Sequence, residues 1–367
     1  MRLLIVYHSR SGTHRGLAAL AARSARRRGA QARVRRVVPL TDEDTGDDAP
    51  CVQPGDLRWA DAVILGSPTH FGSPTGAFKR FLDSTSPLWR ANELRGLAVG
   101  AMSSSNARHG GRDSALLAIQ RCAFHWGAVV VPPPGRPAAG GPLGVSVSLT
   151  ALPADEALAD AVDGLVEGVL SVAGRLSVPV PDHRPAVAVI ADPGPPELAE
   201  LGDAVDGAVT GLDAEVVRLS PQAALDPGDM AGFDALVLGG VVRAGLPDPG
   251  TVALVQRWSD TGLAGLPAAG FVVTPDAEDG AESGVLGLYT ALLHAGAVIV
   301  PAGRSDHPQP DGAGNPYGTS MPAGACAAAR WAARLESAEH MTHLVRVARQ
   351  LRNSTLRPPN LEDQLPI

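Results

Sequence analysis

The stretch His125-Trp-Gly-Ala-Val-Val-Val-Pro132 recurs almost unchanged as His294-Ala-Gly-Ala-Val-Ile-Val-Pro301. The similarity extends upstream without a gap, because residues 96–132 align with residues 265–301. An internal repeat of this length means that one structural unit is present twice. The chain of 367 residues also exceeds the ~100–200 residues of a usual domain. Two homologous domains are therefore predicted.

Each copy alternates short apolar runs with longer stretches of helical period. In the first copy the runs are residues 3–7, 33–38, 62–65, 97–102 and 128–131, and in the second copy they are residues 186–191, 215–219, 234–238, 268–273 and 297–300. Short, continuous apolar runs are typical of buried parallel strands, and the stretches between them fit covering helices. Two tandem α/β domains are predicted, each a doubly wound parallel sheet of five strands in the order 2-1-3-4-5.

The domain boundaries follow from a proline-rich segment. Prolines 179, 181 and 185 exclude a helix or a central strand between the two copies. We expect a first domain over residues 1–178, a linker over 179–184 and a second domain over 185–352. Residues 353–367, which contain three prolines, are expected to form an extended tail.

Composition and charge exclude several classes of protein. The 31 basic and 38 acidic residues give a net charge of −7, which argues against a nucleic-acid partner. The three cysteines form no CxxC pair, so we expect neither a disulfide framework nor a metal site. No run approaches the ~18 apolar residues of a membrane helix. A soluble, cytoplasmic protein that acts on small molecules, without a membrane partner, is predicted.

A doubly wound sheet binds its ligand at the carboxyl ends of the strands. The loop after the first strand offers hydroxyls, a glycine and backbone N–H groups at the start of a helix, which together suit a phosphate monoester. Its residues are Ser9, Arg10, Ser11, Gly12, Thr13 and His14. The alternative is an ordinary Ser/Thr helix cap.

Two further loops are expected beside this phosphate loop. The loop after the third strand carries Pro68, Thr69, His70 and Phe71, and the last two could flank a flat ring. The loop after the fourth strand is small and polar, and it could hydrogen-bond the edge of a heterocycle; its candidates are Ser103, Ser104, Ser105, Asn106, His109 and Gly110. The three loops together predict one pocket for a phosphate and a planar polar ring.

These residues resemble the flavodoxin-like NAD(P)H:quinone oxidoreductases of the WrbA type. The resemblance rests on Ser9–Thr13, on Gly66-Ser-Pro-Thr-His-Phe-Gly72, on Phe78–Asp83 and on the serine triplet 103–105. It implies FMN as cofactor, with the phosphate at the first loop and the ring against the third-strand loop. It also implies NAD(P)H as co-substrate, and it places the aromatic residue of the substrate side at Trp89.

The second copy lacks this equipment. Its first-strand loop reads Ala191-Asp-Pro-Gly-Pro-Pro-Glu197, where prolines remove N–H donors and carboxylates would repel a phosphate. We therefore expect no FMN in this copy. The family that this chain resembles assembles as dimers, so the resemblance implies that the protein can form a homo-oligomer. The second copy is a candidate built-in partner that contributes Tyr317, His307 or Arg304 to the flavin pocket.

The leading hypothesis is an FMN-dependent oxidoreductase that passes hydride from NAD(P)H to a quinone or a similar flat electrophile, as a specialised tailoring enzyme. FMN supplies the chemistry, so few acid/base residues are needed. His70, His109 and Tyr317 are the catalytic candidates, and Trp89, His307 and Tyr317 are the candidates for contacting substrate. The alternatives are a flavodoxin-like electron carrier and a flavin-free scaffold. The arginines at 23, 26–28, 33, 35 and 36 fit a solvated face or, alternatively, a site for the 2′-phosphate of NADPH.

Overall fold

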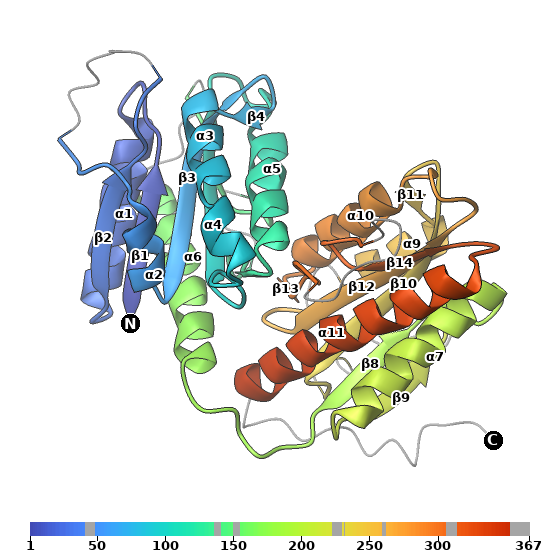
Figure 1. The fold of residues 1–367 in the computed structure, drawn as a ribbon. Helices are drawn as coiled ribbons and strands as arrows, with labels where there is room; N and C mark the ends of the chain where they lie inside the picture. Colours follow the sequence, from blue (N-terminus) through green and yellow to red (C-terminus); the bar gives the residue numbers. More distant parts are fainter. Residues whose placement is uncertain are drawn as a thin grey trace. The chain divides into compact units, whose positions relative to one another are not determined.

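The chain divides into two compact units between Ser177 and Val178 (Figure 1). This computed structural model describes residues 1–40, 48–135, 141–149, 155–221, 230, 232–258, 262–305 and 314–352. The predicted tail over 353–367 lies outside the described residues. Each unit is a sheet with helices on both of its faces.

The first unit is built on a parallel sheet. Its strands are β1 (Arg2–Tyr7), β2 (Gln31–Arg36), β3 (Ala62–His70), β5 (Ala98–Ser105), β6 (Val129–Val130) and β7 (Val145–Ser148). The order is β2-β1-β3-β5, and both β6 and β7 pair with β5. This order matches the predicted 2-1-3-4-5, except that the fifth strand is divided: β6 pairs with the first half of β5 and β7 with the second half.

Burial explains why these segments form strands. Residues Leu3–Tyr7 of the central strand β1 are at most 1% exposed, as expected for a strand covered on both faces. By contrast β2 lies at the edge, and all of its residues are at least partly exposed. Its arginines protect that edge, because charged side chains discourage pairing with another chain.

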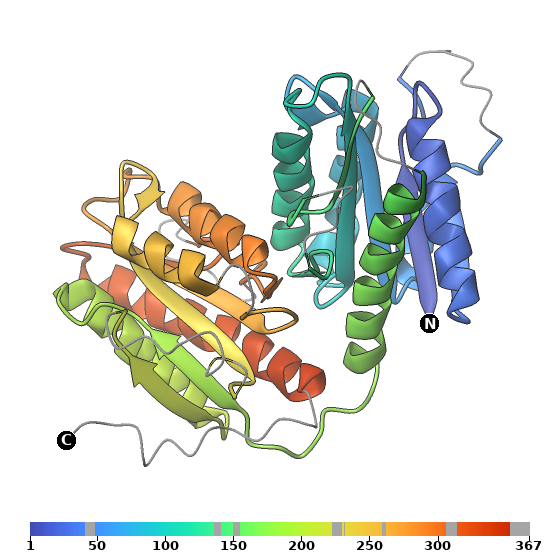
Figure 2. The ribbon, with the colours of Figure 1, turned by 180° about the vertical axis from the view of Figure 1, so that it is seen from behind.

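Helices cover both faces of this sheet. They are α1 (Thr13–Arg27), α2 (Pro54–Trp59), α3 (Gly76–Ser84), α4 (Ser86–Arg90), α5 (Arg112–His125) and α6 (Asp155–Leu176). Helices α1 and α6 pack against each other, and Figure 2 shows them in blue and green in front of the sheet. A Cβ added at Gly100 of β5 would lie 2.8 Å from Val169 of α6, so a glycine is required where helix and strand approach this closely.

Asp163 connects α1 to α6. Its carboxylate accepts hydrogen bonds from Ser24 Oγ at 2.7 Å, from Arg27 at 2.7 Å and from Arg28 at 2.7 and 2.6 Å. The hydrogen bonds from Arg28, and then those from Ser24 and Arg27, hold the pKa of Asp163 far below its ordinary value of 3.8. At least these two of the predicted surface arginines therefore fasten one helix to another.

Replacing Asp163 by asparagine is expected to lower the free energy of unfolding near neutral pH by about 1 kcal/mol, since the ion pairs are partly exposed. Because the folded pKa is depressed, the ionised carboxylate contributes fully above the unfolded pKa, and its contribution is lost as the pH falls through the folded pKa. Urea unfolding of both proteins at about pH 7 and about pH 3 measures this difference. A difference that grew toward acid would contradict the assignment.

Other arginines of the predicted surface cluster also have partners. Arg33 and Arg35 bind the carboxylate of Asp56 at 3.3 and 3.0 Å, and Arg36 donates to the carbonyl of Ala49 at 2.9 Å. Arg23 and Arg26, together with Arg15, instead line a cavity of about 470 Å³ between α1 and β2. The arginines of this cluster therefore have different surroundings: some bind carboxylates or a backbone carbonyl, and others line a cavity.

The second unit repeats the strand order of the first. Its strands are β8 (Ala186–Ile190), β9 (Glu215–Leu219), β10 (Ala235–Arg243), β12 (Pro267–Thr274), β13 (Val298–Ile299) and β14 (Thr319–Pro322), and its helices are α7 (Pro196–Gly211), α9 (Pro249–Trp258), α10 (Ala281–His294) and α11 (Ala327–Leu351). The order is β9-β8-β10-β12, with β13 and β14 both paired with β12. The fifth strand is therefore divided here too.

One hairpin turn recurs at matching places in the two units. In the first unit the turn between β3 and β4 (Ser73–Pro74) has positive φ angles at Phe71 (52°) and Gly72 (79°). In the second unit the turn between β10 and β11 (Leu246–Pro247) has them at Ala244 (50°) and Gly245 (75°). Two consecutive residues with positive φ are typical of a tight hairpin turn of type I′. The two units therefore share local geometry as well as strand order.

Two predictions about strand length were wrong. The third and fourth strands were expected to end at Leu65 and Met102, but β3 continues to His70 and β5 to Ser105. Ser67–His70 and Ser103–Ser105, which the sequence placed in loops, are therefore in strands. The polar residues there resemble a loop in sequence, yet they pair in register with one another, as Ser67 with Ser103 and Pro68 with Ser104.

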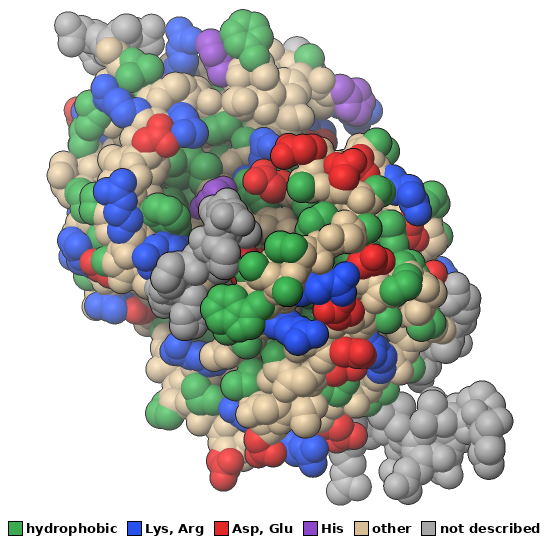
Figure 3. Space-filling view, turned by 45° about the vertical axis from the view of Figure 1, so that its right-hand side comes forward, with side chains coloured by type: hydrophobic (Ala, Val, Ile, Leu, Met, Phe, Trp, Pro, Cys, Tyr) green, Lys and Arg blue, Asp and Glu red, His purple; other side chains and the backbone are tan. Residues whose placement is uncertain are grey.

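On the face drawn in Figure 3, acidic and basic side chains of the described residues are interspersed. Within the described parts of the chain, none of the helices has both the length and the apolar character needed to cross a membrane.

Candidate functional site

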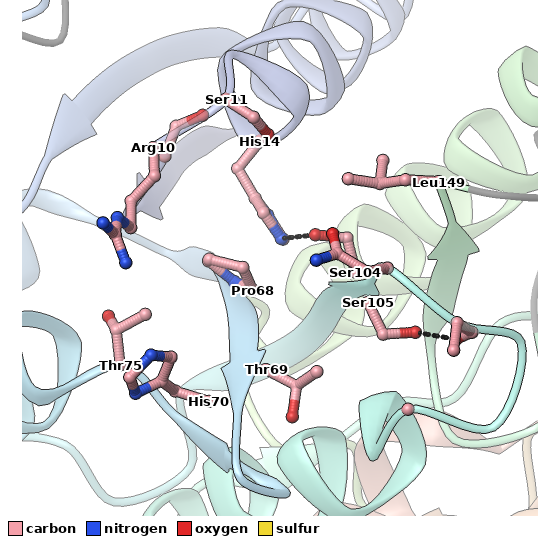
Figure 4. Close-up of a pocket in the computed structure, with 14 residues that line it drawn as sticks. Arg10, Ser11, His14, Pro68, Thr69, His70, Thr75, Ser104, Ser105 and Leu149 are labelled. Atoms are coloured by element: carbon pink, nitrogen blue, oxygen red, sulfur yellow. Dashed lines mark hydrogen bonds between the residues drawn. The ribbon is translucent and has the colours of Figure 1, made fainter.

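A cavity of about 460 Å³ lies where β1, β3 and β5 of the first unit end (Figure 4). These are the three strand ends at which the sequence predicted a pocket. The residues that line the cavity are Ser9, Arg10, Ser11, His14, Pro68, Thr69, His70, Thr75, Ser104, Ser105, Asn106, Ala107, Gly110 and Leu149. Most of the predicted cofactor residues are therefore brought together.

The loop after β1 suits an anion. Gly12 precedes helix α1 at the N-cap position and takes a left-handed conformation with φ of 85°, and no side chain caps the helix there. The Oγ atom of Ser9, close by in the chain, is buried and has no hydrogen-bond partner among the described residues. An uncapped helix start and an unpartnered buried hydroxyl together can bind a phosphate, which accepts hydrogen bonds from both.

His14 lies under this loop, in the first turn of α1. Its side chain is buried at 1% exposure, and Nε2 lies 3.1 Å from the Oγ of Ser104, the contact drawn as a dashed line in Figure 4. Burial, and then the charge of nearby His8, lowers the pKa of His14 to about 3. His14 is therefore neutral near physiological pH, and any attraction of a phosphate must come from the loop rather than from this side chain.

Thr75 lines the cavity although the sequence did not single it out. Its Oγ1 lies 2.9 Å from His8 Nδ1 and also accepts the backbone N–H of Phe78 as the cap of α3. Its own N–H donates to Ser67 Oγ at 3.1 Å. The signal in the sequence was a threonine just before a helix, a common capping position. Thr75 therefore connects Ser67 of β3 to His8, which follows β1.

A close backbone contact shapes the outer side of the cavity. Gly111 has φ of 90°, and a Cβ added there would lie 2.8 Å from the Cα of Gly72. The carbonyl of Gly111 accepts a hydrogen bond from Thr69 Oγ1 at 3.0 Å. The hairpin after β3 and the loop before α5 are therefore fixed against each other, with Thr69 held at the cavity wall.

Several predicted residues do not line the cavity. Among the cofactor candidates these are Gly12, Thr13, Phe71, Ser103 and His109. Phe71 is 99% exposed at the tip of the hairpin, where its ring meets that of His70 edge to face at 5.0 Å. His70 lines the cavity, and both it and His109 are exposed to solvent.

The predicted substrate residues lie elsewhere in the chain. Trp89 is on α4, and its Nε1 donates to the carbonyl of His125 at 2.8 Å, at the end of α5 opposite to the cavity. Tyr317 belongs to the second unit, where its side chain is buried and its carbonyl accepts a hydrogen bond from Tyr289 at 2.5 Å. His307 lies outside the described residues. Roles for these residues stay predictions.

The second unit has different residues at the corresponding loop. Helix α7 follows Pro195, and its first turn contains a second proline and Glu197. The carboxylate of Asp192 accepts the backbone N–H of Gly194 at 2.9 Å. A carboxylate in the first turn of the helix and prolines without N–H groups make this loop a poor phosphate site.

The residues of the first-unit cavity fit FMN. The phosphate would take Ser9 and the start of α1, and the ring would lie along Pro68–His70 and Ser104–Asn106. The unpartnered Ser9 hydroxyl is the observation that supports this fit. Within the described residues, no group of three or more His, Cys, Asp or Glu side chains could hold a metal ion.

Comparison with known proteins agrees with this geometry. A family model described as NADPH-dependent FMN reductase matches residues 1–139. The chain is 34% identical over 146 residues to a NAD(P)H dehydrogenase (quinone) of Deinococcus radiodurans, covering 36% of this chain and 73% of that relative. It is 36% identical over 144 residues to the same-named protein of Geobacter sulfurreducens, covering 36% and 71%.

A solved structure is similar as well. It is the flavodoxin, WrbA-like protein from Agrobacterium tumefaciens, with a TM-score of 0.37 and 21% identity over 47% of this chain and 98% of that chain. Both sequence relatives are more than 30% identical to this chain, which covers more than two thirds of the length of each. The chain therefore belongs to the NAD(P)H dehydrogenase (quinone) family.

Proposed function

We propose that this chain is an FMN-dependent oxidoreductase that transfers hydride from NAD(P)H to a quinone or a similar flat electrophile. The observation that carries the proposal is one cavity with an uncapped helix start and an unpartnered Ser9 hydroxyl on one side. Its other side is lined by residues of β3 and β5. Such a cavity suits a ligand that has a phosphate at one end and a flat ring at the other.

The chain's own residues would bind and orient the cofactor. FMN, when bound, supplies the hydride chemistry. Ser9 and the first turn of α1 would bind the phosphate, and Thr69, fixed by its hydrogen bond to Gly111, would orient the ring. His70 lines the cavity and is exposed, so it can exchange a proton with solvent and donate it to the reduced acceptor.

The purified protein is expected to bind one FMN per chain and to lose its flavin absorbance when NADH or NADPH is added without oxygen. Absorbance titration of the apoprotein with FMN measures the stoichiometry, and anaerobic spectra measure reduction. Absence of FMN binding would refute the proposal. FMN that binds but is not bleached by either nucleotide would support an electron carrier instead, and two FMN per chain would overturn the expected difference between the units.

Two finer parts of the proposal concern the second unit and the substrate. We propose that the second unit acts in place of a partner subunit, with Tyr317, His307 and Arg304 as its candidate contributors. We also propose that the enzyme serves a specialised tailoring reaction. The lack of a comparable phosphate loop at residues 191–197 supports a division of tasks between the units.

A further inference from the structure

His14 is a buried residue of the candidate site whose role the proposed function does not use. Its Nε2 contacts Ser104 Oγ at 3.1 Å. Its Nδ1 is buried and has no hydrogen-bond partner among the described residues. A Cβ added at Gly66 would lie 3.0 Å from Nδ1, so the glycine leaves just enough space for the ring. The ring is therefore held between Gly66 in the middle of β3 and Ser104 of β5.

The unpartnered nitrogen identifies the tautomer. A neutral imidazole carries its hydrogen on one nitrogen only, and the other nitrogen can only accept a hydrogen bond. If the hydrogen were on Nδ1, a buried N–H group would have no acceptor, and such orphaned donors are rare in proteins. With the hydrogen on Nε2, the donor has Ser104 Oγ as its acceptor. The Nε2–H tautomer is therefore favoured.

This tautomer fixes what Ser104 can do. A hydroxyl whose oxygen accepts from His14 still has its own hydrogen to donate. Ser104 is only 3% exposed and lines the cavity, and Figure 4 shows its side chain meeting His14 there. The neighbouring serine differs, since the hydroxyl of Ser105 already donates to the carbonyl of Ala107 at 2.5 Å. Of these two serines, Ser104 has the hydrogen available to a ligand.

We propose that His14 is a positioning residue that, as its Nε2–H tautomer, orients Ser104 so that the serine hydroxyl donates a hydrogen bond to an acceptor atom of FMN. The inference rests on the proposed function for the identity of the ligand. The orientation of Ser104 by His14 is a property of the apoprotein, and it can be tested without FMN.

The first experiment reads the tautomer in the apoprotein. Long-range ¹H–¹⁵N correlation spectra of the histidine rings distinguish Nε2–H from Nδ1–H, and the signal of His14 is assigned as the one missing in His14→Gln. The expected result is a neutral ring with the hydrogen on Nε2 across about pH 5–8, the range in which an ordinary histidine titrates. A hydrogen on Nδ1, or a ring that becomes charged in this range, would overturn the proposal.

The second experiment measures the effect on FMN binding by fluorescence titration of apoproteins. Ser104→Ala and His14→Leu are each expected to weaken FMN binding about tenfold, the usual value of one hydrogen bond. The double variant is expected to lose no more than either single one, because both remove the same interaction. His14→Gln retains a donor at the Nε2 position and is expected to bind FMN within about twofold of the wild type. Additive losses, or a loss in His14→Gln as large as in His14→Leu, would contradict the positioning role.

Two controls keep the outcomes separate. Ser177→Ala removes a hydroxyl that donates to the carbonyl of Ala173 near the end of α6, and it is expected to leave FMN binding unchanged. If His14→Leu does not fold, Ser104→Ala and the spectra of the wild type still decide the question. If the wild type binds no FMN but shows the Nε2–H tautomer, the proposed function fails while the orientation of Ser104 stands.

Discussion

Replacing Gly111 by alanine is expected to weaken FMN binding more than tenfold and to destabilise the first unit by about 2–4 kcal/mol. Holding alanine at φ of 90° costs about 1–3 kcal/mol. The new Cβ would also lie 2.8 Å from the Cα of Gly72, and backbone cannot turn aside as a side chain can. The hairpin and the loop before α5 would move apart, and Thr69 would lose its acceptor. FMN titration and thermal unfolding measure the two effects.

The second unit offers a matched control for this variant. Gly280 has φ of 79°, and a Cβ added there would lie 2.6 Å from the Cα of Gly245. Gly280→Ala is therefore expected to cause a comparable loss of stability, in the second unit, and to leave the FMN dissociation constant unchanged. Equal losses of FMN binding in the two variants would show that the site does not depend on the contact between Gly72 and Gly111 in particular.

Replacing Glu336 by glutamine is expected to stabilise the protein at about pH 8 by about 3 kcal/mol and to have little effect at about pH 4. Glu336 lies on α11 and is 9% exposed. Burial, and then the charge of Glu339, raises its pKa from 4.5 to about 7. As the pH rises from 4.5 to 7, the unfolded chain releases this proton while the folded chain keeps it, so the stability of the wild type falls. Glutamine removes that dependence.

Urea unfolding of Glu336→Gln and of the wild type, at several pH values, measures this difference. Glu282→Gln, at an exposed position in the first turn of α10, is a control expected to change stability by less than about 0.5 kcal/mol at every pH. A stability difference for Glu336→Gln that stayed constant from acid to alkaline pH would show that the carboxyl does not titrate in the folded protein as described.

The strands of the fold could largely be predicted from apolar runs, but their ends and the divided fifth strand could not. Val145–Ser148 forms β7 although it is short and contains two serines, because β5 provides a partner for it. Pairing with a distant strand leaves no local signal in so short a segment. Pro68 gave a misleading signal, since proline has no N–H group and is uncommon inside strands.

The site residues could be predicted where they are neighbours in the sequence, and they could not be predicted where strand pairing or turn conformation determines their position. The first loop of the cavity could be predicted because its residues Ser9–His14 stand together in the sequence at the start of a helix. Leu149 was missed because it reaches the cavity only through β7, which was itself missed. Phe71 was expected at the ring, yet it points into solvent, since the turn it shares with Gly72 is set by backbone conformation.

The division of the fifth strand has a consequence for how the ligand-bearing part of the sheet behaves. The half of β5 that carries Ser104 has β3 on one side and β7 on the other, so its backbone groups are occupied on both edges. Amide hydrogens there should exchange slowly with solvent even without cofactor. Removing the pairing of β7 would turn the same half into a sheet edge, open to strand addition by another chain. The segment Val145–Ser148 therefore places the edge of the sheet one strand away from Ser104.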